Sequence, residues 1–176
     1  MIFQETALKG AFTIDLDRLE DERGFFARSW CVKEFKAKGL DAGLVQCNVS
    51  YNKLRGTLRG MHYQVAPAAE VKVVRCTSGA IHDVIADLRA DSPTYKKTFS
   101  VLLSAENRRS LYIPKHFAHG FITLTADTEV LYQMSEYYVP DCARGFRWDD
   151  PSFKITWPEQ VRVISEKDRT YPDYAG

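Results

Sequence analysis

Several features that would mark a membrane, secreted or dinucleotide-dependent protein are missing from this sequence. No apolar run approaches the roughly 18 residues that a membrane-spanning helix needs. The first residues, "MIFQETALKG", lack the basic start and apolar core of a signal peptide. No glycine-rich loop of the dinucleotide-binding type is present. We therefore expect no membrane partner, no secretion and no redox dinucleotide.

Excess charge and paired cysteines are missing as well. The chain carries 24 Lys and Arg against 23 Asp and Glu, a net charge of +1, and its basic residues are spread along the whole length. A nucleic-acid-binding surface would show as a basic stripe, so no nucleic-acid partner is expected. The four cysteines show no C-x-x-C spacing, which favours free thiols in a reducing compartment and predicts a cytoplasmic protein.

Short apolar runs recur along the chain at close intervals. Most are four to eight residues long, rich in Val, Ile, Thr, Phe and Tyr, and bounded by Gly, Pro, Asn, Asp or Ser. This pattern predicts an all-β sandwich or barrel. The length of 176 residues suits one domain, and no repeat or linker divides residues 1–176.

Three segments depart from the strand pattern. Residues 29–40 predict a helix with Ser29 as its N-cap and Gly39 as its stop. The segment "SAENRR" predicts a single helical turn after Ser104. Residues 145–160 carry two tryptophans and two prolines, which predicts irregular chain packed over the β core.

Two histidines stand in segments that can place them at the mouth of a barrel. His62 lies in "LRGTLRGMHYQ" and His119 in "YIPKHFAHGF", and inward positions alternate along each strand. Cupin metal sites resemble Gly-x5-His-x-His with a Glu further on, then Pro-x-Gly-x-x-His. Here Gln64 replaces the second histidine, His116 replaces the glycine, and Glu70 comes late. Gln64 is a poor ligand for metals that imidazole favours, so the spacing favours a general base without excluding a metal.

A base at His62 would need three kinds of support. A carboxylate on its second ring nitrogen would fix the tautomer, but spacing alone cannot choose one among 23 acidic residues. Lys72, between apolar neighbours in "VKVVRC", could stabilise a developing oxyanion if it points inward, or could lie on an exposed strand face. Tyr132 in "VLYQMSEYY" could donate a proton, or could simply pack.

Other residues suit a phosphorylated, flat ligand. Arg23, Arg59 and Gln46 can donate to phosphate oxygens, although arginines are common on surfaces. Phe26 and Tyr138 offer aromatic faces for a base, although core packing is the ordinary role of such residues.

Ordered blocks along nearly the whole chain resemble the deoxysugar-nucleotide 3,5-epimerases, typified by dTDP-4-dehydrorhamnose 3,5-epimerase. The combination of "LRGMHYQ" with "FAHGF" carries most of the specificity. The blocks are "DERGFF" (21–26), "QCNVS" (46–50), "GTLRGMHYQ" (56–64), "KVVRC" (72–76), "DVIADLR" (83–89), "SPT" (92–94), "YIPKHFAHGF" (112–121), "YYVP" (137–140), "WDDP" (148–151), "ITWP" (155–158) and "SEKD" (165–168).

The resemblance implies a double-stranded β-helix, which is a cupin-like jelly roll with a few short helices, working as a homodimer without metal or organic cofactor. It implies inversion of C3, C5 or both in a nucleoside-diphosphate 4-keto-6-deoxy sugar, by proton abstraction and reprotonation through an enolate. Such a product would enter the synthesis of deoxysugars and surface polysaccharide such as lipopolysaccharide O-antigen.

The resemblance also implies roles for individual residues. His62 matches the base, Asp168 in "SEKD" the carboxylate that orients it, Lys72 the group that stabilises the enolate oxygen, and Tyr132 the opposing acid. The remaining matches contact the substrate: Gln46, Asn48, Arg59 and His119 at diphosphate and sugar, Tyr138 at the nucleotide, and Arg23 and Phe26 from the partner subunit.

Two positions depart from the family pattern. Arg28 stands where many members carry a glutamate near the nucleobase, which leaves the nucleobase undetermined. His116 stands in place of a usual glycine and would affect the choice of sugar if it faced the pocket. The alternatives that stay open are a 3,4-ketoisomerase of the same substrate class, a metal-dependent cupin such as a dioxygenase or metal-binding protein, and an inactive sugar-nucleotide-binding module.

Overall fold

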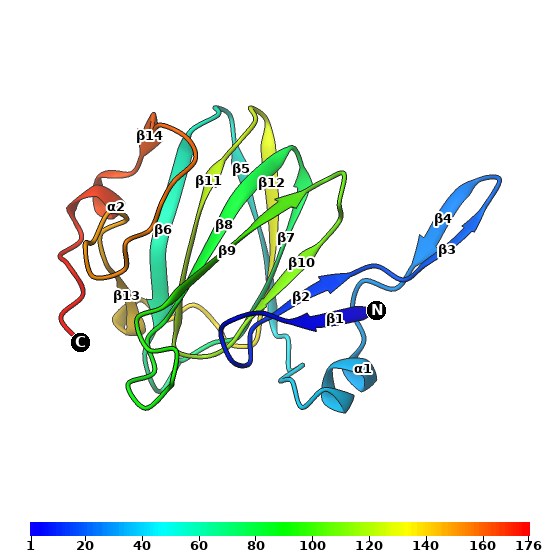
Figure 1. Ribbon diagram of the computed structural model, residues 1–176, viewed down its shortest axis with the longest axis horizontal. Coiled ribbons are helices and arrows are strands. Elements are labelled where there is room, and N and C mark those ends of the chain that lie inside the picture. Colours follow the sequence, from blue (N-terminus) through cyan, green and yellow to red (C-terminus); the bar gives the residue numbers. More distant parts are fainter.

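Two antiparallel β-sheets contain most of the strands of the computed structural model, which describes all of residues 1–176 (Figure 1). The first sheet has the order β1 (Ile2–Glu5), β2 (Phe12–Asp15), β10 (Ser110–Ile113), β7 (Lys72–Ser78), β12 (Thr128–Met134) and β5 (Gln46–Asn52). The second has the order β13 (Ala143–Gly145), β6 (Thr57–Gln64), β11 (Phe117–Thr123), β8 (Ala80–Asp87) and β9 (Thr98–Ser104). A short strand, β14 (Val163–Ile164), pairs with β6 in parallel.

The largest core cluster joins the inner faces of these two sheets. Val74 and Val130 come from the first sheet, and Ile81, Ile85 and Phe121 from the second, and all five are fully buried. Apolar side chains from both sheets therefore interdigitate, as in a sandwich or jelly roll. The all-β, cupin-like fold predicted from the sequence is confirmed.

Residues 145–160 cover the outer face of the second sheet. The rings of Phe146 and Phe153 stack with centroids 4.2 Å apart, and they pack with Met61 and Val84 in a separate buried cluster. Figure 1 shows the chain from this segment to the C-terminus lying alongside β6. The predicted irregular packing of this segment is confirmed, and it keeps the C-terminal residues beside β6.

The two helix predictions fare differently. Helix α1 spans Val32–Ala37 and buries Phe35, with Cys31 at the N-cap position and no side-chain cap. Ser29 is therefore not the cap, because the chain only enters the helix two residues later. Gly39 follows its end with a φ of 71°, a left-handed conformation that suits a helix stop.

After Ser104 the chain makes the single predicted turn, in which the Arg108 N–H donates to the Ser104 carbonyl at 2.9 Å, and it does not continue as a helix. Ser104 Oγ accepts a hydrogen bond from the backbone N–H of Asn107 at 3.0 Å, so Ser104 caps this turn as predicted. The other short helices are the 3₁₀ turn η1 (Pro140–Cys142) and α2 (Glu166–Thr170). None of the helices has the length and apolar character that crossing a bilayer requires.

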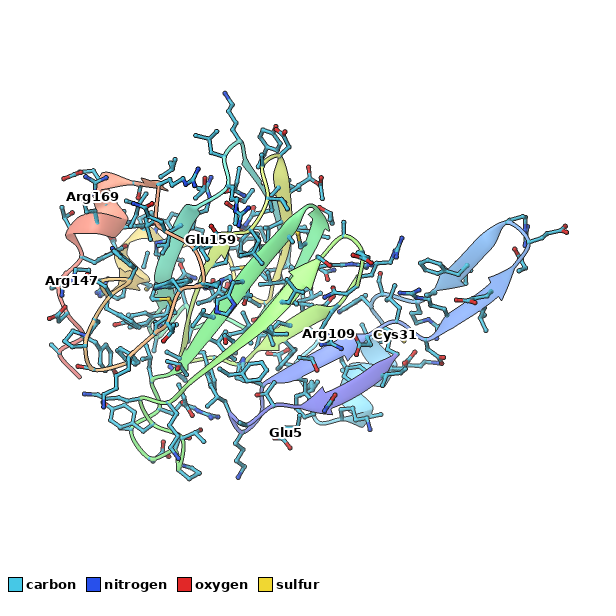
Figure 2. The ribbon with its side chains drawn as sticks, turned by 45° about the horizontal axis from the view of Figure 1, so that its top comes forward. Glu5, Cys31, Arg109, Arg147, Glu159 and Arg169 are labelled. Atoms are coloured by element: carbon cyan, nitrogen blue, oxygen red, sulfur yellow. The ribbon has the colours of Figure 1, made fainter.

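A hairpin of β3 (Arg18–Asp21) and β4 (Gly24–Ala27) extends away from both sheets (Figures 1 and 2). It pairs only with itself, as a separate two-stranded sheet. Leu19 is 69% exposed and Phe26 is 72% exposed. These two side chains are cross-strand neighbours in the hairpin, and an isolated two-stranded hairpin is marginal in water.

Candidate active site

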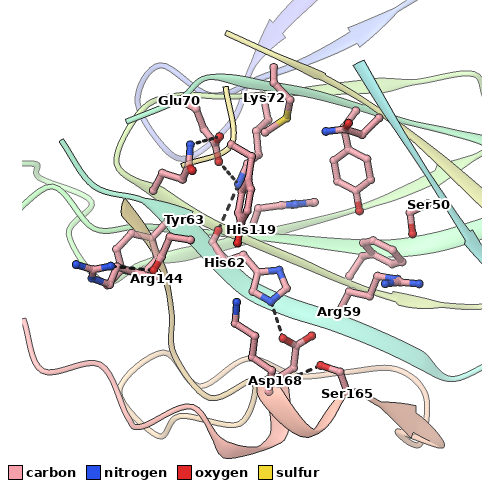
Figure 3. Close-up of a pocket in the computed structure, with 18 of the residues that line it drawn as sticks. Ser50, Arg59, His62, Tyr63, Glu70, Lys72, His119, Arg144, Ser165 and Asp168 are labelled. Atoms are coloured by element: carbon pink, nitrogen blue, oxygen red, sulfur yellow. Dashed lines mark hydrogen bonds and ion pairs between the residues drawn. The ribbon is translucent and has the colours of Figure 1, made fainter. Parts of the chain in front are cut away.

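A cavity of about 610 Å³ lies between the two sheets (Figure 3). Its walls come from β5, β7 and β12 of the first sheet, from β6, β11 and β13 of the second, and from α2. Residues more than 100 positions apart in sequence therefore meet around one space. The cavity size is in the range usual for pockets that enclose a small organic ligand.

His62 and Asp168 form a hydrogen-bonded pair on one wall. His62 Nε2 lies 2.6 Å from Asp168 Oδ1, and the other carboxylate oxygen accepts the Gly60 backbone N–H at 3.2 Å. Ser165 Oγ caps α2 by accepting the N–H of Asp168 at 3.1 Å. The carboxylate is buried, whereas the imidazole side chain is 41% exposed to the cavity. Figure 3 shows the His62 ring directed at the Asp168 carboxylate.

The surroundings of Asp168 favour its ionised form. Burial by itself would raise the pKa of this carboxyl. The hydrogen bond and positive charge of His62 oppose that effect, and so do the bonds from Gly60 and Ser165, so that the pKa is lowered overall. An ionised Asp168 is the partner that an imidazolium at His62 requires.

Lys72 lies on β7 and is buried against the cavity, so it points inward. Its Nζ lies 2.9 Å from Glu70 Oε1 and 3.4 Å from the carbonyl oxygen of His62. The second oxygen of Glu70 accepts a hydrogen bond from Gln64 Nε2 at 2.8 Å. Glu70 is thus bonded to both Gln64 and Lys72.

A second histidine–carboxylate pair lies deeper in the same cavity. His119 stands directly opposite His62 in the β11–β6 pairing, so both face the cavity as predicted. His119 Nε2 lies 2.8 Å from Asp83 Oδ2, and both residues are buried. The ring of Tyr132, on β12, lies 6.0 Å from the ring of His119 between centroids.

Tyr132 is held in its protonated form. Burial raises the pKa of its phenol, and the nearby charge of Asp83 raises it further. Arg59 and a hydrogen bond with Ser50 act in the opposite direction without overcoming burial. The phenol is therefore a proton carrier that gives up its proton only to a strongly basic centre.

Cationic side chains without a carboxylate partner surround the opening. Arg59 donates from Nε to the Asn52 side-chain oxygen at 2.7 Å and from Nη2 to a backbone carbonyl. Arg144 donates to two backbone carbonyls, and Lys167 lies next to Tyr171. Gln46, Asn48 and Tyr138, which the sequence selected, also line the cavity.

Four selected residues lie outside the cavity of their own chain. Arg23 and Phe26 belong to the projecting hairpin, where Arg23 bonds to Asp21. Arg28 follows the hairpin, and its Nη1 lies 3.0 Å from Glu34 Oε1. His116 is exposed and has a φ of 64°. This left-handed backbone explains why glycine is usual at that position, and His116 does not narrow the cavity.

The residues that sequence reasoning missed are mainly the partners of those it found. Asp83 stands in a run of apolar strand residues, which is a sign of a buried carboxylate in need of a partner. Tyr171 had no such sign. Its ring lies against Gly145, where an added Cβ would meet ring carbons at 2.5 Å, and 6.0 Å from the His62 ring between centroids.

The donor set does not converge on a metal-binding arrangement. No group of three or more His, Cys, Asp or Glu side chains is placed to hold a metal ion. His62, Glu70 and His119, the three candidate ligands, are each bonded to a different partner. The geometry suits proton transfer instead.

Comparison with known proteins agrees with this site. A family model described as dTDP-4-dehydrorhamnose 3,5-epimerase matches residues 5–175. A curated relative of that name from Sinorhizobium fredii is 43% identical over 173 residues, covering 98% of this chain and 89% of the relative.

Solved structures resemble the whole fold. A dTDP-4-dehydrorhamnose 3,5-epimerase from Bacillus anthracis, with TDP and PPi bound, has a TM-score of 0.94 at 42% identity, covering 98% of this chain and 99% of that one. A 3′-monoepimerase from Streptomyces bikiniensis, in complex with dTDP-quinovose, has a TM-score of 0.87 at 30% identity, covering 96% of this chain and 85% of that one. The chain belongs to the dTDP-4-dehydrorhamnose 3,5-epimerase family.

Proposed function

We propose that this protein inverts C3, C5 or both in a nucleoside-diphosphate 4-keto-6-deoxy sugar. The observation that carries the proposal is the placing of the His62–Asp168 pair, Lys72 and Tyr132 around one cavity, in a chain of this family. A general base, an oxyanion stabiliser and a proton donor are what inversion next to a ketone requires.

His62 acts as the base. The 4-keto group acidifies the hydrogens on C3 and C5, because the electron pair left behind delocalises onto the C4 oxygen. Asp168 holds Nε2 of His62, so Nδ1 is the ring nitrogen that accepts the proton. The ionised carboxylate then stabilises the imidazolium.

Lys72 and Tyr132 complete the reaction. The ammonium of Lys72 donates to the C4 oxygen and stabilises the enolate. Tyr132 delivers a proton to the face of the ring opposite His62, which inverts the carbon. Its raised pKa keeps the phenol protonated until the carbanion is available.

The rim of the cavity suits a diphosphate. The two carboxylates that line it, Glu70 and Asp168, are each paired. Arg59, Arg144 and Lys167 leave an excess of positive charge that phosphate oxygens can neutralise. Gln46, Asn48 and His119 add donors for phosphate or sugar, and Tyr138, 59% exposed, offers a ring face to the nucleobase.

The projecting hairpin supports a homodimer. Leu19 and Phe26 would be covered by a second copy of the chain, and Val49 and Tyr51 on the edge strand β5 are exposed apolar residues that suit the same contact. In that arrangement Arg23, Phe26 and Arg28 would reach the partner's cavity. The enzyme would work in the cytoplasm, where its free thiols stay reduced.

Deuterium incorporation tests the function directly. The purified full chain is incubated in deuterated water with 4-keto-6-deoxyglucose linked to thymidine, uridine, cytidine or guanosine diphosphate, and the sugars are analysed by NMR. We expect deuterium and inversion at C3, C5 or both, first with the thymidine compound that the relatives' names carry. Migration of the carbonyl to C3 would instead show a ketoisomerase, and absence of exchange with all four would contradict the proposal.

A further inference from the structure

A cluster of three buried polar side chains lines one wall of the cavity. Gln64 is 4% exposed, Glu70 is 8% exposed and Lys72 is 7% exposed. A buried polar group destabilises the folded state unless it is hydrogen-bonded. Only Lys72 in this cluster faces the reacting sugar in the proposed mechanism, so the other two need a separate explanation.

The amide of Gln64 is the centre of this cluster. Its Nε2 donates to Glu70 Oε2 at 2.8 Å, to the Ala68 carbonyl at 3.0 Å and to the Tyr137 carbonyl at 3.1 Å. Its Oε1 accepts the backbone N–H of Val139 at 2.8 Å. All of the amide's polar atoms are therefore engaged, and exchanging its O and N would lose these bonds.

Two of these bonds fix the backbone on both sides of Tyr138. The segment runs between β12 and η1 and has no strand partner of its own at Tyr137 and Tyr138. Tyr138 lies between the carbonyl and the N–H that Gln64 holds, and its ring lines the cavity. Gln64 thus holds the backbone segment that positions the Tyr138 ring.

The same amide also sets the position of the Lys72 counter-ion. Glu70 offers one oxygen to Gln64 and the other to Lys72 Nζ at 2.9 Å. A buried ammonium that loses such a carboxylate is left as an uncompensated charge, which is strongly unfavourable. In the sheet register Lys72 stands beside Ile113 and Met134, which are uncharged. The other titratable groups that share the cavity are Arg59, His62, Tyr63, His119, Tyr132, Tyr138, Arg144, Lys167, Asp168 and Tyr171.

We infer that Gln64 is a positioning residue that couples the nucleotide to the enolate-stabilising lysine. Movement of the Tyr138 segment on nucleotide binding is transmitted through Gln64 and Glu70 to the Lys72 ammonium. The inference rests on the proposed function for the identity of the nucleotide ligand, but the contacts that carry the coupling belong to the free protein.

The test uses NMR of the full chain with ¹³C-labelled lysine, in which the Lys72 signal is assigned by its loss in Lys72→Arg. We expect TDP, added without any sugar, to shift the Lys72 signal in the wild type. Gln64→Met should abolish that shift and weaken TDP binding about tenfold, the effect of losing a buried hydrogen bond of ordinary strength. Gln133→Met, on β12 of the first sheet and outside the cavity, should keep both.

A second variant, Glu70→Gln, tests the coupling even if Gln64→Met fails to fold. Glu70→Gln keeps the shape and the bond with Gln64, so its nucleotide binding should stay near that of the wild type. The TDP-induced shift of its Lys72 signal should be lost, because the neutral amide no longer pairs with the ammonium. A role in packing alone would leave that shift unchanged.

A TDP-induced Lys72 shift that survives in Gln64→Met overturns the coupling, as does one that survives in Glu70→Gln. These readouts need no turnover, so they stay distinct from a failure of the epimerase assay. If TDP binds the wild type without moving the Lys72 signal, the coupling is wrong even when epimerisation is observed.

Discussion

His62 Nε2 lies 2.6 Å from Asp168 Oδ1, although 106 residues separate the two in the sequence. The parallel pairing of Val163 with Thr57 and of Ile164 with Leu58 lays the chain beside β6 and delivers α2 to the histidine. The pair thus forms because the C-terminal segment folds back beside β6. The charge of Asp168 can be removed without changing a residue of either sheet.

Asp168→Asn should slow solvent exchange at the sugar carbons by about 10²- to 10⁴-fold, the range that a positioned acid–base group contributes. The amide keeps the size of the carboxylate, but it cannot stabilise an imidazolium by charge. Initial exchange rates measured by NMR give the factor. Asp173→Asn, at an exposed carboxylate near the same segment, should leave the rate unchanged; a near-normal rate in Asp168→Asn would remove Asp168 from the mechanism.

Tyr132→Phe should separate proton removal from inversion. His62 can still take the proton and return a deuteron to the same face, so exchange should continue while inversion falls at least about 100-fold. Tyr137→Phe removes an exposed phenol and serves as the control. His62→Ala should abolish both exchange and inversion, and exchange that persists in that variant would show that another group is the base.

Arg59→Met should weaken binding of the diphosphate. A hydrogen bond to a charged group contributes about 1.5 to 3 kcal/mol, which corresponds to a rise in the TDP dissociation constant of roughly 10- to 150-fold. Calorimetric titration at two salt concentrations measures both the loss and the reduced salt dependence. Arg55→Met is the matched control, since Arg55 pairs with Glu159 outside the cavity. Equal affinities for the two variants would place the phosphates elsewhere.

Mixed dimers should show whether the hairpin serves the partner's cavity. Arg23→Ala and His62→Ala homodimers should both have reduced activity, for different reasons. In a mixed dimer, the cavity with an intact His62 receives the hairpin of the other subunit, which carries an intact Arg23. About one quarter of wild-type activity per subunit pair should therefore return after random exchange of subunits, because half of the dimers are mixed and each has one complete cavity. No recovery would show that Arg23 serves its own chain or none.

His82 should make the fold less stable in mild acid. Burial lowers its pKa below the ordinary value of 6.5, despite the nearby charge of Asp83, and its Nε2 has no hydrogen-bond partner. As the pH falls below about 6.5 the unfolded chain binds a proton more readily than the folded one, so the free energy of unfolding decreases. His82→Leu should flatten that decrease between pH 7 and 5.

Urea unfolding at several pH values measures this effect. His116→Asn provides the control, since His116 is exposed and asparagine tolerates its left-handed backbone. If both variants follow the wild-type pH curve, the proton uptake at His82 is not what weakens the fold.

Strand patterns and short motifs contain enough to predict the fold and half of the site. His62 and His119 were placed in the cavity by strand alternation, and the inward direction of Lys72 was one of two open options. Asp168 could not be chosen by spacing, because its approach depends on a two-residue parallel pairing that leaves no periodic pattern. The family resemblance supplied it.

Other features depend on information that a single sequence does not hold. In the sequence Glu70 and Gln64 look like an incomplete metal motif, whereas in the structure they are hydrogen-bonded to each other. The N-cap at Cys31 has no side-chain bond, so propensity pointed to Ser29 instead. Arg23, Phe26 and Arg28 stand apart from the cavity of their own chain, and their roles remain predictions.

The short element that carries Asp168 has a thermodynamic consequence. Only Asp168 is buried among the five residues of α2, and β14 adds just two residues of pairing. Segments with few buried contacts open at a lower free energy than the sheets they cover. Warming should therefore abolish activity by local unfolding of this segment. The backbone amides of β7, β8 and β11 should remain protected from hydrogen exchange at the same temperature.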